Sequence, residues 1–140
     1  MEKQIKTENF NIYIKDGIIY GDILTKNFTL DIVEEMIKAR HELTEGKLVP
    51  ILADLKDVKN MPREARQRMS EKDAGKGTYC VAIVINSKVQ VVLFNFFNAI
   101  YKAPAPTKLF TDRNKAETWI KKQKQNMDKK LPPEIDKAIE

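Results

Sequence analysis

Few side chains in this sequence have the types and spacing of a catalytic group. The single cysteine, Cys80, and the single histidine, His41, belong to different expected elements, a strand and a helix. A nucleophilic cysteine needs an accessible, electropositive surrounding that lowers its pKa, whereas Cys80 stands in the apolar run "TYCVAIVI". We therefore expect a buried, inert thiol and a histidine at the boundary of a helix. No Cys–His or Ser–His–Asp arrangement can be built from them.

The stretch "DAGKGT", Asp73 to Thr78, has some features of a phosphate-binding loop. In that loop the pattern G-x-x-x-x-G-K-[ST] leads into a helix whose backbone amides hold phosphate. Here the order is Gly-Lys-Gly-Thr, and the apolar residues that follow are typical of a strand. The stretch therefore predicts a helix end and a turn.

Four aspartates stand near expected strand ends or helix termini, where α/β folds place their sites. They are Asp54, Asp57, Asp73 and Asp112. Carboxylates of this kind can hold a hard cation, but their spacing forms no motif, and capping or solvation accounts for each. We therefore predict no catalytic residues, no metal site, no cofactor and no enzymatic activity.

Length and composition indicate one soluble domain. The chain has 140 residues, of which 42% are hydrophobic and 32% are charged, as in ordinary globular proteins. No apolar run approaches the roughly 18 residues that cross a bilayer, and the polar start "MEKQIKTENF" lacks a signal-peptide pattern. With one cysteine there is no internal disulfide framework. We expect a cytoplasmic protein without a transmembrane segment.

Charge is unevenly distributed along the chain. Residues 1–55 carry 7 Lys/Arg and 10 Asp/Glu, a net of −3, whereas residues 56–140 carry 18 and 10, a net of +8. Such asymmetry can mark a surface that binds nucleic acid or membrane. The basic residues are spread over three expected helices and a tail, so we predict a solvated surface and no specific nucleic-acid partner.

The periodicity of apolar residues predicts alternating strands and helices. Strands are expected over 5–14, 18–24, 49–55, 78–85 and 107–110, and helices over 30–43, 62–76, 88–101 and 111–122. Asp16-Gly17 between apolar runs predicts a β-hairpin, and Thr29 predicts a helix start. This order indicates an α/β domain with an N-terminal β-hairpin, a mixed, mostly parallel sheet and four helices. We place the domain at 1–122 and a charged tail, with a possible short helix, at 123–140.

This order of elements resembles a STAS-like (SpoIIAA-like) domain, the fold of bacterial anti-sigma-factor antagonists. The strand ending "ILADLKDV" and the terminal "LF" strand carry the likeness. The stretches "ILADLKDVKNMPREAR", "NFF" and "PAPTKLFTD" also resemble small uncharacterised STAS-like proteins grouped with CRAL-TRIO-type lipid-transfer domains. The resemblance covers roughly residues 5–122 and implies the fold, with no agreed activity.

The antagonists carry a phosphorylatable serine at the start of the helix after this strand. At that place the present sequence has Met61, Pro62 and Arg63, and the nearest hydroxyl, Ser70, lies two turns further along. The phosphorylation switch is therefore not expected here.

The expected helix over 88–101 has a wider apolar arc than one sheet contact requires. Phe94, Phe97 and Tyr101 lie at i, i+3 and i+7 and form a second stripe, which we call the aromatic stripe, with Asn95 and Asn98 on the back. Three interpretations stay open. The tail or a neighbouring helix covers the stripe, or it forms a homodimer or partner interface, or it lines a pocket for an apolar ligand.

The sequence thus predicts a non-catalytic STAS-like binding or regulatory domain that acts through protein–protein interaction or self-association. The alternative is a carrier or sensor of a small apolar, lipid-like ligand in a pocket beside the 88–101 helix. In both cases the binding candidates are the aromatic stripe with Asn95 and Asn98.

Overall fold

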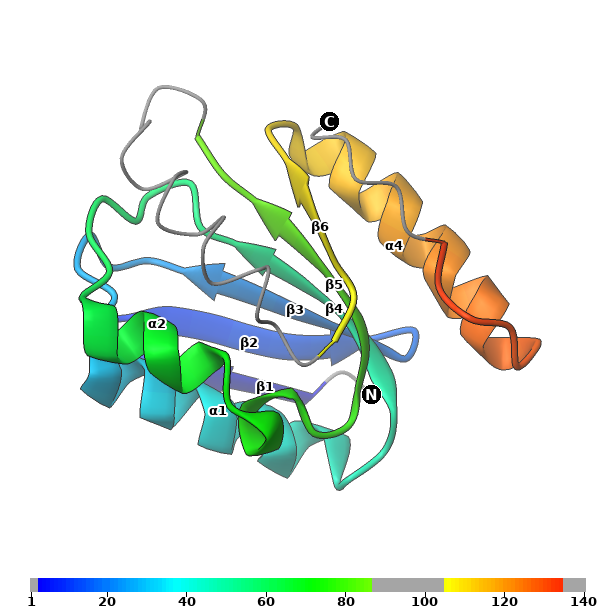
Figure 1. Ribbon diagram of the computed structural model, residues 1–140, viewed down its shortest axis with the longest axis horizontal. Coiled ribbons are helices and arrows are strands. Elements are labelled where there is room, and N and C mark those ends of the chain that lie inside the picture. Colours follow the sequence, from blue (N-terminus) through cyan, green and yellow to red (C-terminus); the bar gives the residue numbers. More distant parts are fainter. Residues whose placement is uncertain (1–2, 87–104, 135–140) are drawn as a thin grey trace.

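The computed structural model describes residues 3–86 and 105–134, and its centre is one six-stranded sheet (Figure 1). The strands lie side by side in chain order: β1 (Lys3–Lys6), β2 (Phe10–Lys15), β3 (Ile18–Ile23), β4 (Val49–Asp54), β5 (Thr78–Val84) and β6 (Thr107–Phe110). The pairs β1–β2 and β2–β3 are antiparallel, and the three pairs from β3 to β6 are parallel. The predicted α/β class with a mixed sheet is confirmed.

The N-terminal part contains one more strand than the sequence indicates. The single strand expected over 5–14 is wrong, because the chain reverses at Thr7, whose Oγ1 accepts hydrogen bonds from the backbone N of Asn9 and of Phe10, each at 3.1 Å. A threonine hydroxyl that binds nearby backbone amides favours a turn over a continued strand. The hairpin at Asp16-Gly17 is confirmed, since both residues have positive φ, 52° and 76°, between β2 and β3.

The described residues contain three α-helices and one 3₁₀-helix, not the four helices that the sequence predicts. They are α1 (Leu30–Thr44), α2 (Arg63–Met69), the 3₁₀-helix η1 (Lys72–Gly75) and α4 (Arg113–Asp128). The helix expected over 88–101 lies outside the described residues. α1 begins after Thr29 and ends at Glu45 and Gly46, both with positive φ, as expected. None of the helices in the described part of the chain is long and apolar enough to cross a membrane.

The helix expected over 62–76 is broken into α2 and η1. α2 ends at Met69, and Glu71 is already extended. Ser70 contributes to this end because its hydroxyl binds the Gln67 carbonyl oxygen at 2.7 Å, in competition with helical bonding. Arg68 then joins the two pieces through bonds of 2.8 and 2.7 Å to the carboxylate of Asp73.

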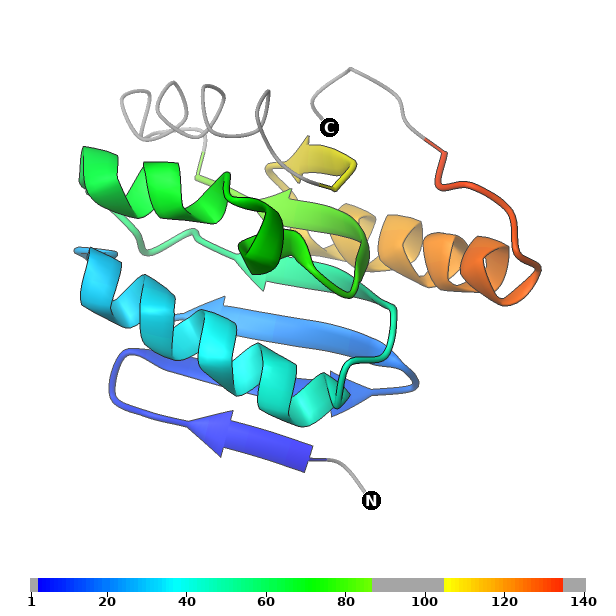
Figure 2. The same ribbon diagram turned by 60° about the horizontal axis from the view of Figure 1, so that its bottom comes forward.

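The helices divide between the two faces of the sheet. Figure 2 shows α1 and α2 in front of the sheet and α4 on the other side. Because side chains alternate along a strand, each face has its own apolar core. One core is built around Phe10, Ile12, Val33 and Ile37, and the other around Tyr20, Leu52, Phe110 and Ile120.

The last helix is longer than the sequence pattern suggests. Asp112 caps α4, with its side chain accepting a 2.8 Å bond from the backbone N of Asn114, and Ala116, Trp119 and Ile120 pack on the sheet as expected. The boundary placed at residue 122 falls inside α4, which continues to Asp128. Gln123 is fully buried, and its Oε1 accepts a 2.8 Å bond from the backbone N of Glu134.

An ion cluster holds the start of α4 against the sheet. Arg113 Nη1 donates to Asp22 Oδ1 at 2.6 Å and to Asp54 Oδ2 at 3.0 Å. Its Nη2 lies 3.3 Å from the Tyr13 hydroxyl, and its Nε bonds Glu117 at 3.1 Å. Asp22 and Asp54 are direct neighbours in the β3–β4 register. The arginine therefore separates two adjacent carboxylates that would otherwise repel each other.

We expect Arg113→Met to lower the free energy of unfolding by roughly 2 kcal/mol, because Asp22 and Asp54 would lose their shared partner. Urea unfolding measures the loss, and Asp22→Asn added to Arg113→Met should restore part of it. The control is Lys115→Met on the exposed side of α4, where a change within about 0.5 kcal/mol is expected. Equal effects of the two single variants would contradict a structural role for the cluster.

Candidate functional site

A cavity of about 120 Å³ lies between the sheet and the helices α1 and α2. Its lining is almost entirely apolar and comes from β2 to β6, from the two helices and from the segments next to them. Phe28 and Met61 line one end of it, and Arg40, Ala74 and Thr78 line the other. Concave apolar spaces with a few polar groups are the usual form of small-molecule sites.

Two small residues at the centre of the sheet create this space. Gly21 of β3 and Ala53 of β4 are direct neighbours in the register, and both line the cavity. Gly21 is not in the left-handed region, so its conformation does not require glycine. A Cβ placed there would meet nothing nearer than Ile12 Cγ1, at 3.9 Å. The missing side chains at these two positions therefore leave volume that larger residues would occupy.

Three methionines form part of the wall opposite the sheet: Met36 of α1, Met69 of α2 and Met61 just before α2. A methionine side chain is unbranched and polarisable and adapts its shape to what it contacts. A wall of this kind accommodates apolar molecules of different shapes.

Arg40 supplies the charge at one end of the cavity. It is only 9% exposed, because it follows Val33 and Ile37 at helical spacing on the buried face of α1. Its Nη1 donates to Thr78 Oγ1 at 2.7 Å, and its Nη2 donates to the Ala74 carbonyl oxygen. Burial lowers the pKa of Arg40 to about 10. This value is still well above 7, so the guanidinium stays charged at neutral pH.

His41 lies next to this guanidinium, with its Nε2 at 3.1 Å from Arg40 Nη2. Burial and the positive charge of Arg40 lower the pKa of His41. The imidazole is therefore neutral near pH 7, and it adds no second positive charge to this end of the cavity. The sequence placed His41 at the boundary of a helix, which its partial burial confirms.

The sequence patterns did not single out Arg40. Its spacing of three residues from Ile37 and seven from Val33 could have indicated that it lies on the buried face of α1.

The other chemistry-bearing residues do not meet at the cavity. Cys80 is buried on the α4 face, and burial raises its pKa to about 12, which agrees with the inert thiol expected. Asp54 bonds Arg113, Asp73 bonds Arg68 and Asp112 caps α4. Asp73 also lies in η1 just before the positive-φ Gly77, so "DAGKGT" is a helix end and turn as predicted. Across 3–86 and 105–134, no three His, Cys, Asp or Glu side chains group as metal ligands.

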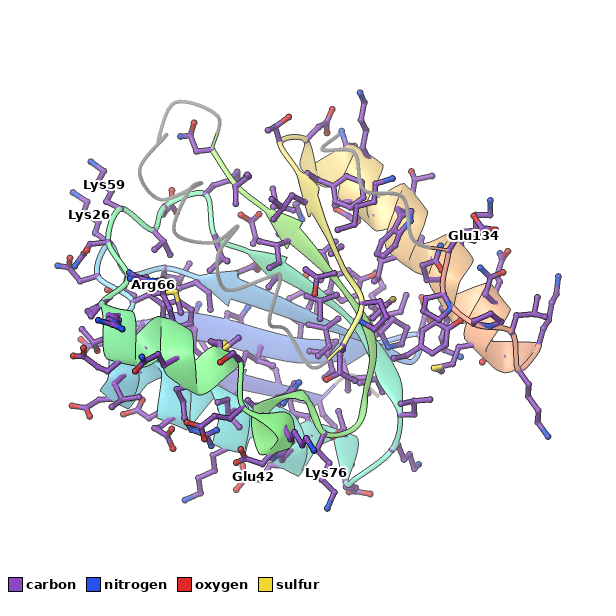
Figure 3. All side chains as sticks on the ribbon, viewed as in Figure 1. Lys26, Glu42, Lys59, Arg66, Lys76 and Glu134 are labelled. Carbon is purple, nitrogen blue, oxygen red and sulfur yellow. The ribbon has the colours of Figure 1, made fainter. Side chains whose placement is uncertain are left out.

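Basic side chains gather at the carboxyl ends of β3 and β4. Figure 3 shows Lys26, Lys59 and Arg66 at this end, and Glu42 and Lys76 near the end of α1. The two loops are joined there, because the Lys26 carbonyl oxygen accepts bonds of 2.8 and 3.0 Å from the backbone N of Lys59 and of Asn60. Both lysines are exposed, as in the solvated surface that the sequence predicts.

The aromatic stripe, Phe94, Phe97 and Tyr101, lies outside the described residues together with Asn95 and Asn98. Its role as an interface or as part of a pocket stays a prediction from the sequence.

Comparison with known proteins gives the fold and a family. A family model described as "Domain of unknown function (DUF7793)" matches residues 12–124. No curated protein matches the chain. Among solved structures, an uncharacterised protein of the DUF3478 family from Shewanella loihica, with a SpoIIAA-like fold, aligns with a TM-score of 0.53 at 16% identity. The alignment covers 86% of this chain and 92% of that one. The STAS/SpoIIAA-like fold predicted from the sequence is confirmed.

We expect the Cys80 thiol of the native protein to react with a thiol reagent such as DTNB only as fast as the protein unfolds. Burial and the raised pKa keep it protonated and out of reach. The same reagent should react at once in concentrated guanidinium chloride. Thr118→Cys, on the exposed side of α4, is the positive control under native conditions. Rapid labelling of native Cys80 would show that the thiol is accessible.

Proposed function

We propose that this chain, which belongs to the DUF7793 family, binds a small apolar ligand in the cavity between the sheet and α1 and α2. The protein holds the ligand without transforming it and acts as a carrier or sensor. The observation that carries the proposal is the apolar cavity above Gly21 and Ala53. An engineered apolar cavity of about 150 Å³ binds benzene, and the space here, about 120 Å³, is close to that size.

The energetic cost of the cavity supports this function. The apolar walls of this space lack part of the packing contacts that a filled core makes, which lowers the stability relative to a filled core. Larger residues at positions 21 and 53 would remove much of this cost, whereas a bound apolar molecule recovers it when the ligand is present.

The residues at the place of the antagonists' serine also favour ligand binding over phosphorylation. Met61 stands there, is buried and lines the cavity. A thioether cannot be phosphorylated, but it can adapt to a bound apolar molecule. A binding role without catalysis is also supported by Cys80, because its thiol is protonated and faces the other side of the sheet.

Ligand binding is tested by filling the cavity with larger side chains on the sheet. We expect the double variant Gly21→Ala, Ala53→Val to bind 1-hexanol at least tenfold more weakly than the wild type, because the added methyl groups occupy the space of the alkyl chain. NMR titration of the methyl signals measures binding, and thermal unfolding should show a stabilised ligand-free variant. Thr118→Val, which adds no bulk near the cavity, is the matched control. Unchanged hexanol binding by the double variant would refute the proposal, as would a wild type that binds neither 1-hexanol nor its carboxylate analogue hexanoate.

Self-association through the aromatic stripe is a separate expectation that the sequence pattern supports. We expect sedimentation velocity at high micromolar concentration to show a dimer for the wild type and a monomer for Phe94→Asp, because a carboxylate cannot be buried in an apolar interface without large cost. Thr118→Asp introduces the same charge on α4 and should leave the dimer intact. A wild-type monomer at this concentration would rule out the homodimer.

A further inference from the structure

The guanidinium of Arg40 is a buried cation that no carboxylate of the described residues contacts. Within the described residues, Arg68 and Arg113 each pair with carboxylates. In the same part of the chain, Arg40 contacts only a hydroxyl, a carbonyl oxygen and an imidazole. All three partners are neutral, so they satisfy hydrogen bonds without compensating the positive charge.

Arg40 also has a hydrogen-bond donor that is not paired. A guanidinium carries five N–H groups, and the three contacts of Arg40 involve only Nη1 and Nη2. Its Nε is buried and has no hydrogen-bond partner. Buried donors and buried charges are almost always paired in folded proteins. An unpaired donor on an unneutralised cation, at the end of an apolar cavity, therefore indicates that an anionic acceptor is missing.

We propose that the ligand of this cavity is a small monocarboxylate, with its carboxylate on Arg40 and its apolar body over Gly21 and Ala53. This inference rests on the proposed function and specifies the ligand class. One negative charge matches the single positive charge of the Arg40 guanidinium, since the neighbouring His41 is neutral. The Thr78 hydroxyl, already at 2.7 Å from Nη1, offers a further donor to the same carboxylate.

The cavity volume suits an apolar body of about the size of benzene. Hexanoate and benzoate are of this size, whereas long-chain fatty acids are too large for this space alone. A phosphate monoester carries about two negative charges and more acceptor oxygens than one arginine and one hydroxyl can satisfy. The geometry therefore favours the carboxylate over the phosphate.

The experiment compares hexanoate with 1-hexanol, which has the same chain without the charge, by NMR titration of the full-length protein at pH 7. We expect the wild type to bind hexanoate at least tenfold more tightly than hexanol. Arg40→Gln should remove this preference and leave hexanol binding within a factor of about three. Arg40→Lys should retain part of it, and Arg63→Gln, a matched change at an exposed arginine, should retain all of it.

The outcomes separate this inference from the proposed function. If the wild type binds hexanol as tightly as hexanoate, the carboxylate inference fails while the apolar site stands. Should neither compound bind, the proposed function fails and the inference fails with it. Tighter binding of hexyl phosphate than of hexanoate would also overturn the carboxylate assignment. The wild-type comparison needs no variant, so it decides the question even where Arg40→Gln does not fold.

Discussion

The parallel register between β3 and β4 determines both faces of this protein. It places Gly21 beside Ala53 on the face that α1 and α2 cover, and Asp22 beside Asp54 on the face that α4 covers. Because successive side chains point to opposite faces, a slip of β4 by one residue against β3 would break both pairs. Ala53 would then face α4, and the carboxylate of Asp54 would enter the apolar core beside Gly21. One strand pairing thus positions the cavity and the ion cluster together.

The two faces differ in how their arginines are paired. On the α4 side, aromatic and aliphatic residues form a buried cluster, and Arg113 pairs with both adjacent carboxylates. The α1 and α2 side has a cavity, and no carboxylate of the described residues contacts Arg40 at its end. A small apolar anion would supply the second face with both apolar volume and a negative charge.

The fold is a scaffold, and the residues that line the cavity are particular to this chain's sequence. A SpoIIAA-like architecture is shared with a solved protein at only 16% identity, so the architecture alone does not define what is bound. The local features do carry chemical meaning, since they depend on particular residue types. A glycine where no positive φ requires it and a buried arginine with an unpaired donor each have a cost in stability, and the methionines of the wall can adapt to molecules of different shapes. Their coincidence at one cavity is more easily explained by a ligand than by folding alone.

The sequence by itself determined the order of the elements after residue 10, the Asp16-Gly17 hairpin, the buried stripe of α1 and the packing side of α4. These follow from period, capping and turn residues, which act over a few positions along the chain. At two places the pattern predicted the wrong structure, because a hydroxyl group binds nearby backbone groups. The Thr7 hydroxyl favours a chain reversal, and the Ser70 hydroxyl favours a helix end. Only the tertiary structure decided where volume is missing and which charges are paired, because both depend on residues far apart in sequence. The period of α1 places Arg40 on its buried face, but the lack of a carboxylate there is visible only once η1 and β5 are packed beside it.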